Sequence, residues 1–287
     1  MKYQFMQRYG SGSAVLKMCR VLGVSRSGYY SYLRRGLNKR MAENVVLLER
    51  IKSIWNYSEG VYGSPRIRVE LRSRGYTYGK HRIARLMREN GITAIIKRRF
   101  KITTKPDPSL EVAPDLLQRD FSAQAPDEKW IADITYIWTW EGWLYLAAVL
   151  DIYNREVVGW ALHERINKEL VIDALRKALD KRNPEPGLIF HSDQGSQYGS
   201  GKFRKILKAR GILPSMSSKG DCFDNAMMES FFGTLKKEHV YRKVFHTKEE
   251  ARRNIFEYIE LFYNRKRRHS SINYMTPVEY YEQSCHT

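Results

Sequence analysis

The chain has 287 residues, of which 43% are hydrophobic and 13% aromatic, and this composition is sufficient for a folded protein of two or more domains. The longest clear apolar run, residues 143–150, is far shorter than the roughly 20 residues of a membrane-spanning helix, and Met1 is followed by polar and basic residues rather than a signal sequence. The three cysteines lack zinc-site or disulfide spacing, so we expect reduced thiols and a cytoplasmic location.

The net charge of +19 comes entirely from the first third of the chain. Residues 1–105 contain 24 Lys and Arg against 5 Asp and Glu, whereas residues 106–287 contain 26 of each. A solvated basic face is the simpler explanation, but so large an asymmetry favours a polyanionic partner, because each phosphate contact releases condensed counterions. Nucleic acid is the preferred partner, and no membrane contact is expected, because no amphipathic helix carries a bulky apolar face.

Helical patterns occupy this basic first third. Residues 13–35 predict two short helices around Gly23, with Ser25 as a possible N-cap, an arrangement found in DNA-binding helix-turn-helix units and in simple helical hairpins alike. Apolar spacing predicts further helices over residues 41–57, 66–74 and 80–90. We therefore expect a partial helix-turn-helix-like segment at 1–40 and a basic helical DNA-binding module at 41–105, with Arg66 and Arg82 among its DNA contacts.

A proline-rich stretch with little periodicity, residues 106–126, is expected to be a linker. Beyond it, aromatic and β-branched runs at 129–139, 143–153 and 155–162 predict antiparallel strands. A helix at 167–179, a strand at 188–191, a helix at 201–210 and a strand at 212–216 follow. This order predicts an α/β domain over residues 127–240, with a mixed five-stranded sheet flanked by helices, and then a C-terminal helical extension at 241–287.

Three acidic residues occupy unusual positions in this domain. Asp133 lies within an apolar strand, where an unpaired carboxylate is costly, and Asp193 follows another strand. Glu229 lies at the edge of the apolar stripe of a helix for which Asp224 is a plausible N-cap. One such residue alone is best explained by solvation or a buried ion pair. The three together predict a site where carboxylate oxygens bind Mg²⁺.

Phosphoryl transfer explains why such a site is needed. Attack on a phosphodiester develops negative charge on the entering and leaving oxygens, and two Mg²⁺ ions about 3.5–4 Å apart stabilise both. Three carboxylates suffice because Mg²⁺ keeps several waters, and without metal at least one of their pKa values should be raised. Lys236 lies within about 20° of Glu229 on the helix surface, where it is as well placed to contact a DNA phosphate as to face solvent.

Six short motifs carry a further signal. They are YGSPRI (62–67), WIADITY (130–136), HSDQGSQY (191–198), SSKGDCFDNA (217–226), ESFF (229–232), and YNR (263–265) followed by HSS (269–271). Taken together, they resemble the retroviral-integrase-type DDE transposases of bacterial insertion sequences, and more narrowly the downstream-frame (OrfB) product of the IS-three family. The resemblance covers essentially the whole chain and implies an RNase H-like catalytic core with Asp133, Asp193 and Glu229 as metal ligands.

The resemblance also implies a reaction order: water attacks at an element end to free a 3′-hydroxyl, which then attacks another phosphodiester. It implies two Mg²⁺ ions replaceable by Mn²⁺, double-stranded DNA at element ends and target, a homo-oligomer on DNA, and a location at the bacterial nucleoid. Lys219, Asn225 and Arg265 are expected DNA contacts, with residues 265–268 as a phosphate-binding patch or a solvated helix end. His191 and His269 could contact DNA or the site, and His269 is included among the expected DNA contacts. Both are ranked below the carboxylates, because a lone histidine is more often structural.

One departure from the family concerns the first residues. Members commonly act as a fusion with an upstream-frame product that carries a full helix-turn-helix and a leucine zipper, whereas this chain begins with a short helical pair and has no sustained heptads. An upstream-frame partner or fusion is therefore expected.

Two other functions are weighed against the Mg²⁺-dependent DDE transposase. A non-catalytic DNA-binding auxiliary or domesticated product would have no reason to keep three converging acids. An RNase H-like nuclease acting on RNA in hybrids is disfavoured by the basic module.

Overall fold

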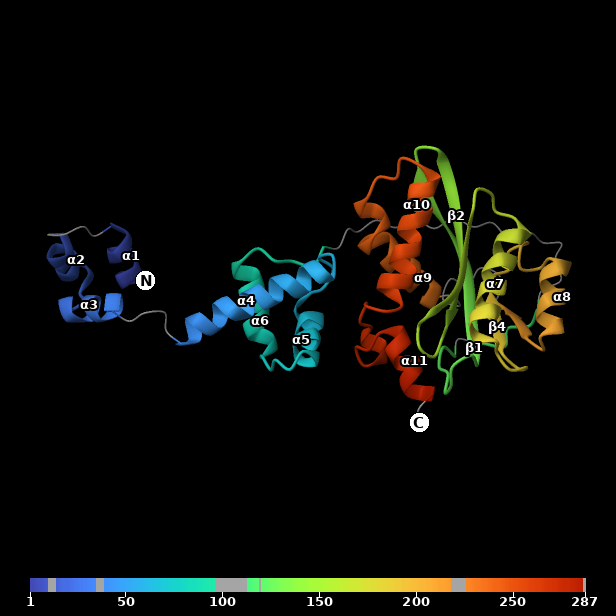
Figure 1. Cartoon of the computed structure of the whole chain (residues 1–287), viewed down its shortest axis with the longest axis horizontal. Coiled ribbons are helices and arrows are strands. Elements are labelled where there is room, and N and C mark those ends of the chain that lie inside the picture. Colours follow the sequence, from blue (N-terminus) through green and yellow to red (C-terminus); the bar gives the residue numbers. More distant parts are fainter. Residues whose placement is uncertain (10–13, 35–38, 96–112, 119, 218–225, 286–287) are drawn as a thin grey trace.

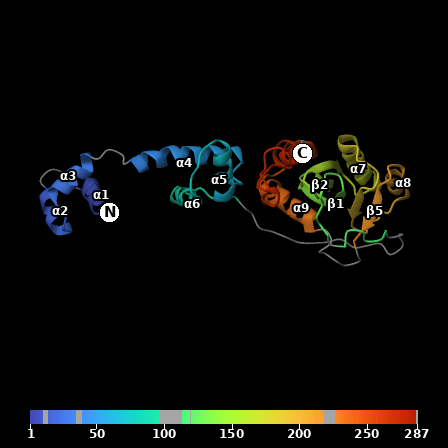
Figure 2. The ribbon, with the colours of Figure 1, turned by 90° about the horizontal axis from the view of Figure 1, so that it is seen from below.

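The computed structural model describes residues 1–9, 14–34, 39–95, 113–118, 120–217 and 226–285. Figure 1 shows three units in a row: a small helical unit at the N-terminus, a second helical unit, and a larger unit in which helices cover both faces of a sheet. Figure 2 gives the same order from a perpendicular direction. Within the described residues, no helix is both long and apolar enough to cross a membrane.

The first unit contains helices α1 (Lys2–Tyr9), α2 (Ala14–Leu22) and α3 (Arg26–Arg34). A small core of Met6, Val15, Cys19 and Tyr29 joins them. The backbone amide of Gly28 donates to Ser25 Oγ at 3.0 Å, which confirms the predicted N-cap of α3. The helical pair predicted at 13–35 is confirmed by α2 and α3, but α1, which precedes it, was not predicted. Met6 is the one buried residue in α1, so this helix has no apolar periodicity to reveal it.

The second unit contains α4 (Lys39–Tyr57), α5 (Ser64–Ser73) and α6 (Lys80–Glu89). Leu47, Ile51 and Ile54 of α4 are almost fully buried and recur at helical spacing, so one face of this long helix packs on the other two. A proline in the first turn of α5 suits a position where no amide donor is needed. The three predicted helices of the basic module are thus confirmed within two residues at each end.

The third unit is built on a five-stranded sheet of order β3-β2-β1-β4-β5. Strands β1 (Lys129–Thr139), β2 (Gly142–Asp151) and β3 (Val157–His163) form an antiparallel meander, and β4 (Ile189–Ser192) and β5 (Leu213–Met216) extend it in parallel from β1. The mixed sheet predicted from the sequence is therefore present, with β1 at its centre. Within β1, only residues 129–131 pair with β4, so the longer β1 continues beyond it.

Helices cover both faces of this sheet (Figure 1). One face carries α7 (Lys168–Arg182) and α8 (Gly201–Ala209), and the other carries α9 (Ala226–Glu238) and α10 (Lys248–Phe256). The chain then forms the π-helical segment η3 (Glu257–Tyr263) and ends in α11 (Pro277–Cys285), with short 3₁₀ turns η2 (Val240–Arg242) and η4 (Ser270–Ile272) between. Successive β1 residues alternate between the two cores: Ile131 and Ile137 pack with α9, and Trp130 and Ala132 with α7.

Gly159 of β3 marks the closest approach between the sheet and α7. A Cβ at this position would lie 2.3 Å from the carbonyl oxygen of Ala174 and 2.6 Å from the amide nitrogen of Ala178, both backbone atoms. We expect Gly159→Ala to lower the free energy of unfolding by about 1–3 kcal/mol, because the helix must move away from the sheet. Urea denaturation measures this, with Gly201→Ala as control, since nothing lies within 4 Å of its added Cβ. Equal losses in both variants would contradict the close-packing explanation.

The described part of the expected linker packs against the sheet. The amide of Leu116 donates to Ser215 Oγ at 2.9 Å, and the amide of Met216 donates to the carbonyl of Pro114 at 3.4 Å. Lys129 at the start of β1 forms an ion pair with Asp120 at 2.7 Å. Residues 113–118 therefore run beside β5, and Asp120 lies against the start of β1. The domain boundary at residue 126 stays a prediction.

A buried ion-pair network joins the end of α9 to the C-terminal extension and to the helical module. Glu238 accepts hydrogen bonds from Arg267 Nε at 2.7 Å and Nη2 at 2.8 Å, and from the Tyr258 hydroxyl at 3.0 Å. Arg66 of α5 lies 3.6 Å from the same carboxylate. The Arg267 side chain is only 5% exposed, so Glu238 is its essential countercharge.

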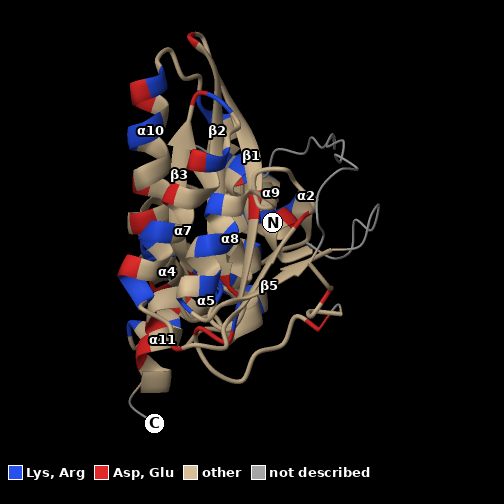
Figure 3. Ribbon diagram, turned by 90° about the vertical axis from the view of Figure 1, so that its right-hand side faces the viewer, with Lys and Arg blue, Asp and Glu red and all other residues tan. Residues whose placement is uncertain are grey.

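A second contact repeats this connection. Glu70 of α5 pairs with Arg268 at 2.7 Å, and the Tyr62 hydroxyl donates to the carbonyl of Lys266 at 2.8 Å. The helical module is thus held to the residues that follow η3 by buried polar contacts. Figure 3 shows Lys and Arg interspersed with Asp and Glu over the helices of the third unit, in agreement with the neutral charge count beyond residue 105.

Candidate active site

The parallel register of β1 and β4 brings two of the three acids to the same level. Ile131 pairs with His191, and each aspartate lies two residues further along the chain, Asp133 within β1 and Asp193 directly after β4. This is the point where β4 ends and β1 continues alone. The amide of Ile134 donates to Asp133 Oδ1 at 2.7 Å, and the amide of Gly195 donates to Asp193 Oδ1 at 3.0 Å. Both carboxylates therefore have a fixed orientation at the same edge of the sheet.

The third acid, Glu229, lies in the first turn of α9. Met228, Phe231 and Leu235 are buried and fix this helix against the face of β1 that Asp133 shares with Ile131. Burial, the charge of Asp193 and the charge of Glu229 together raise the pKa of Asp133 to about 7. Burial also raises the pKa of Asp193. The rise expected for at least one carboxyl pKa is thus found at Asp133, which both other acids influence.

The donor set suits Mg²⁺, a hard cation that takes oxygen ligands, keeps several waters and needs only one or two carboxylates of its own. Within the described residues, no group of three or more His, Cys, Asp or Glu side chains is placed so that it could hold a metal ion. The electrostatics nevertheless fit a cation: Asp133 experiences like charge from two directions, and a divalent ion would relieve that repulsion. The residues present therefore fit an ion that is also held by water and substrate.

Lys236 lies beside the carboxylates, as its position on the helix predicts. It carries the one positive charge among the groups that shift the pKa of Asp133. Its Nζ is 4.3 Å from the centroid of the Tyr136 ring on β1, and burial lowers its pKa. The side chain is thus held between an aromatic ring and a catalytic candidate, and its contact with DNA stays a prediction.

Tyr198 is a site residue that sequence reasoning missed. Its side chain is almost fully buried, its hydroxyl has no hydrogen-bond partner, and burial with the charges of Asp193 and Asp133 raises its pKa well above the usual value. It ends the 191–198 motif five residues beyond Asp193, and this position was the available signal. His191 in the same motif is structural, since its Nδ1 lies 2.9 Å from Ser215 Oγ in the interior of the sheet.

The other predicted DNA contacts lie in different environments. Arg66 pairs with Glu238, and Arg82 bonds to Asn44 at 2.8 Å and Glu43 at 3.1 Å, so both guanidinium groups have protein partners. Arg265 is exposed. Lys219 and Asn225 lie outside the described residues. DNA binding by these five residues stays a prediction.

Both readings of the 265–268 cluster need correction. Arg267 and Arg268 are neither a phosphate-binding patch nor a solvated helix end, because buried carboxylates already hold them. Only Arg265 and Lys266 are exposed. His269 is largely enclosed, with Nε2 2.9 Å from Arg267 Nη1, and burial beside three arginines lowers its pKa to about 2. It is a neutral imidazole in the interior, which fits the structural role ranked first for a lone histidine.

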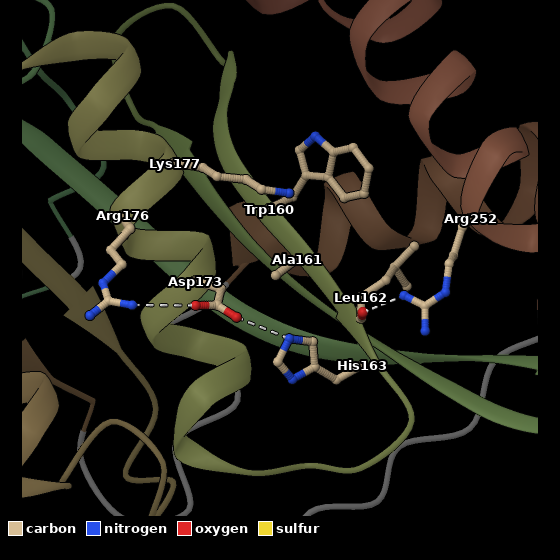
Figure 4. Close-up of a pocket in the computed structure, with 8 residues that line it drawn as sticks. All are labelled: Trp160, Ala161, Leu162, His163, Asp173, Arg176, Lys177 and Arg252. Carbon is tan, nitrogen blue, oxygen red and sulfur yellow. Dashed lines mark hydrogen bonds and ion pairs between the residues drawn. The ribbon is translucent and has the colours of Figure 1, made fainter. Parts of the chain in front are cut away.

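A separate hollow of about 390 Å³ lies between β3, α7 and α10 (Figure 4). In it, His163 Nε2 lies 3.1 Å from Asp173, which also faces Arg176 at 3.8 Å. None of the three acids lines this hollow. Its polar groups are already paired with one another, so the candidate site remains the edge where Asp133 and Asp193 meet.

Comparison with known proteins identifies the class of this fold and site. Models of the integrase core domain match residues 123–222 and 210–277, and a model of an HTH-like domain matches residues 42–100. Among solved structures, a simian T-cell lymphotropic virus intasome is similar over 80% of this chain and 74% of its own, with a TM-score of 0.48 and 14% identity. The HTLV-2 integrase catalytic core in complex with magnesium is similar over 56% of this chain and 99% of its own, with a TM-score of 0.45 and 13% identity.

The closer relatives are bacterial. A 31 kDa protein of insertion element IS600 from Shigella sonnei is 44% identical over 93% of this chain and 98% of its own length. Transposase InsF of insertion sequence IS3A from Escherichia coli is 38% identical over 98% of both chains. The chain belongs to the IS3 family of insertion-sequence transposases. It is an enzyme with an integrase catalytic core, whose reaction is DNA cleavage and strand transfer, and its HTH-like domain binds DNA.

Proposed function

We propose that Asp133, Asp193 and Glu229 are the catalytic carboxylates of this transposase and that they bind Mg²⁺ at the scissile phosphodiester. The observation that carries the proposal is the common level of Asp133 and Asp193 beyond the Ile131–His191 pair, together with the effect of Glu229 on the Asp133 pKa. When bound, the metal would lower the pKa of the attacking water or hydroxyl and stabilise charge on the reacting oxygens.

The residues of the chain have distinct parts in this chemistry. Asp133 is held by strand β1 and the Ile134 amide, so its carboxylate needs no reorientation when substrate arrives. Asp193 is held in the same way by the Gly195 amide. Lys236 brings a positive charge to the site, and we propose that it contacts a phosphate next to the one that is cleaved. The enzyme first frees a 3′-hydroxyl at an element end, and that hydroxyl then attacks a second phosphodiester.

Several finer points belong to the same proposal. Two Mg²⁺ ions act together, and Mn²⁺ replaces them. The DNA is double-stranded, both at the element ends and at the target. The protein acts as a homo-oligomer on DNA in the bacterial cytoplasm at the nucleoid, with an upstream-frame product as partner or fused segment. The HTH-like module supplies most of the basic surface for DNA, since the positive charge of the chain lies before residue 106.

The test is cleavage and joining of labelled element-end DNA with Mg²⁺, by the chain alone and with the upstream-frame product. Asp193→Asn and Glu229→Gln should each reduce both reactions by at least ~10³-fold, because several kcal/mol of charge stabilisation is lost. EDTA should abolish the wild-type reaction, and Mg²⁺ or Mn²⁺ should restore it. Asp173→Asn, in the hollow of Figure 4, is the matched control and should remain active. Wild-type rates in either carboxylate variant would exclude the proposed site.

A further inference from the structure

Arg155 is a half-buried cation whose guanidinium is poorly satisfied by the described residues. It lies in the turn between β2 and β3 with a φ of 65°, in the left-handed region that few non-glycine residues adopt. Its Nη1 donates to the thioether sulfur of Met227 on α9, which is a weak acceptor, and its Nε is buried without a hydrogen-bond partner. Among the described residues, no carboxylate lies within ion-pair distance of this guanidinium.

Two more deeply buried arginines of the chain have the partner that Arg155 lacks among the described residues. Arg182, with a side chain 3% exposed, pairs with Glu156, and Arg267, at 5% exposed, pairs with Glu238. Arg155 is less enclosed, and its pKa is lowered by burial and raised by the charges of Tyr263 and Asp151. Taking a charge partly out of water has a cost that an added acceptor would offset. The guanidinium is therefore suited to an anionic group from outside the described residues.

A pocket of about 260 Å³ lies against this side chain. Besides Arg155, its polar lining includes the hydroxyls of Ser230, Thr234, Tyr263 and Ser271, together with His269. Each hydroxyl can donate a hydrogen bond, and no Asp or Glu is among the described residues that line the pocket. Apolar walls complete the pocket, among them Phe121 and Phe231, and these strengthen any charge interaction made inside it. One guanidinium and several hydroxyl donors form an anion site.

We propose that this pocket binds a phosphate group of the DNA backbone. A guanidinium fork with hydroxyl donors is the arrangement that recognises phosphate oxygens. Ser230 and Thr234 are on α9, and Ser230 directly follows Glu229, so the pocket borders the helix that carries the third acid. It also explains the 269–271 motif, whose histidine and second serine line the pocket. The inference rests on the proposed function only in taking DNA as the polyanion.

The bound phosphate would fix the position of α9. Met227, Ser230 and Thr234 lie on successive turns of this helix, and Arg155 is anchored in the sheet. A DNA strand held between them would tie the helix to the β2–β3 turn when DNA is bound. Arg155 is thus a binding residue that also helps position Glu229.

The test is binding of element-end DNA to the full chain over a range of salt concentrations. Arg155→Met should weaken binding roughly 10- to 100-fold, because a charge-assisted hydrogen bond is lost. The plot of log affinity against log salt should become shallower by about 1, as expected for one lost phosphate contact. Without DNA, the variant should melt no lower than wild type, because it removes a partly buried charge that forms no ion pair with a described carboxylate. Arg176→Met, which removes an arginine from the hollow of Figure 4, should keep the wild-type affinity and slope.

A second variant keeps the proposal open to refutation if Arg155→Met fails to fold. Thr234→Leu fills the pocket and leaves Arg155 in place, and it should reduce the salt slope by the same amount. Wild-type affinity and slope in a folded Arg155→Met, or in Thr234→Leu if the first variant is unfolded, would overturn the inference. Because the assay measures binding, a failure of the carboxylate assignment would instead appear as cleavage by Asp193→Asn and Glu229→Gln, with the Arg155 result unchanged.

Discussion

Asp133→Asn is expected to inactivate the transposase and at the same time to stabilise the metal-free protein. Cleavage and strand transfer should fall by at least ~10³-fold, since the variant loses the carboxylate that both other acids influence. DNA binding should stay within a few-fold of wild type. The gain in stability follows because the asparagine removes a charge that is partly buried and repelled by Asp193 and Glu229.

The stability difference should depend on pH in a defined direction. The Asp133 carboxyl has a pKa of about 7 in the folded protein and near 3.8 when unfolded. Between these values the unfolded chain releases its proton first, so wild-type stability falls as pH rises, and the loss is complete above about 7. This pKa difference between the folded and unfolded states corresponds to a loss of at most roughly 4 kcal/mol in the free energy of unfolding. Chemical denaturation in the presence of EDTA, at pH 5 and at pH 8, measures this difference. The stability advantage of Asp133→Asn over wild type should be larger at pH 8.

The control for this experiment is Asp173→Asn, whose side chain is 43% exposed and lies outside the site. Its stability relative to wild type should change little between the two pH values. Added Mg²⁺ should reduce the advantage of Asp133→Asn, because wild type gains from binding the ion and the variant gains less. A variant that is less stable than wild type at pH 8 would contradict the repulsion on which this prediction depends.

Glu238→Gln should strongly destabilise the protein. It would leave Arg267 buried with a neutral partner, and breaking such a pair typically costs about 3–5 kcal/mol. The same substitution weakens the contact of Arg66 with the end of α9, so the helical module should also become easier to detach. Urea denaturation measures the first effect, and the rate of proteolysis between the module and the integrase core measures the second.

Glu249→Gln on α10 is the matched control, because Glu249 is exposed and forms no ion pair within the described part of the chain. It should change stability by less than about 0.5 kcal/mol. If Glu238→Gln behaved like this control, the network would not hold the module in place, and the two units would have to be joined by their apolar contacts alone.

The strands of the core could be predicted because apolar and β-branched residues run without interruption through them. The predicted bounds of β1 agree with the structure, and β4 and β5 differ by one residue, since a strand buried on both faces is apolar along its whole length. Helix α7 also follows its prediction, with Asn167 as N-cap accepting from the Leu170 amide. Asp133 stood out for the opposite reason, as an acidic residue in the middle of an apolar strand.

What could not be predicted depends on contacts between distant segments. Arginines 267 and 268 look like any basic cluster in the sequence, and only the fold brings Glu238 and Glu70 to them. In the sequence, Tyr198 resembles any other aromatic residue of the core. Only the fold places it near Asp133, which lies 65 positions earlier in the chain. Helix α1 has too few buried residues for a periodic pattern. In each case the missing information was the identity of a partner far along the chain.

The two-residue step from the Ile131–His191 pair to each aspartate limits where this sequence can gain or lose length. Side chains alternate between the faces of a strand, so one inserted residue in that step would turn the carboxylate toward the opposite layer of helices. The hairpin turns and the connections around α7 carry no such limit. Related transposases should therefore differ freely in the spacing between their two aspartates, while the short step that precedes each one stays constant.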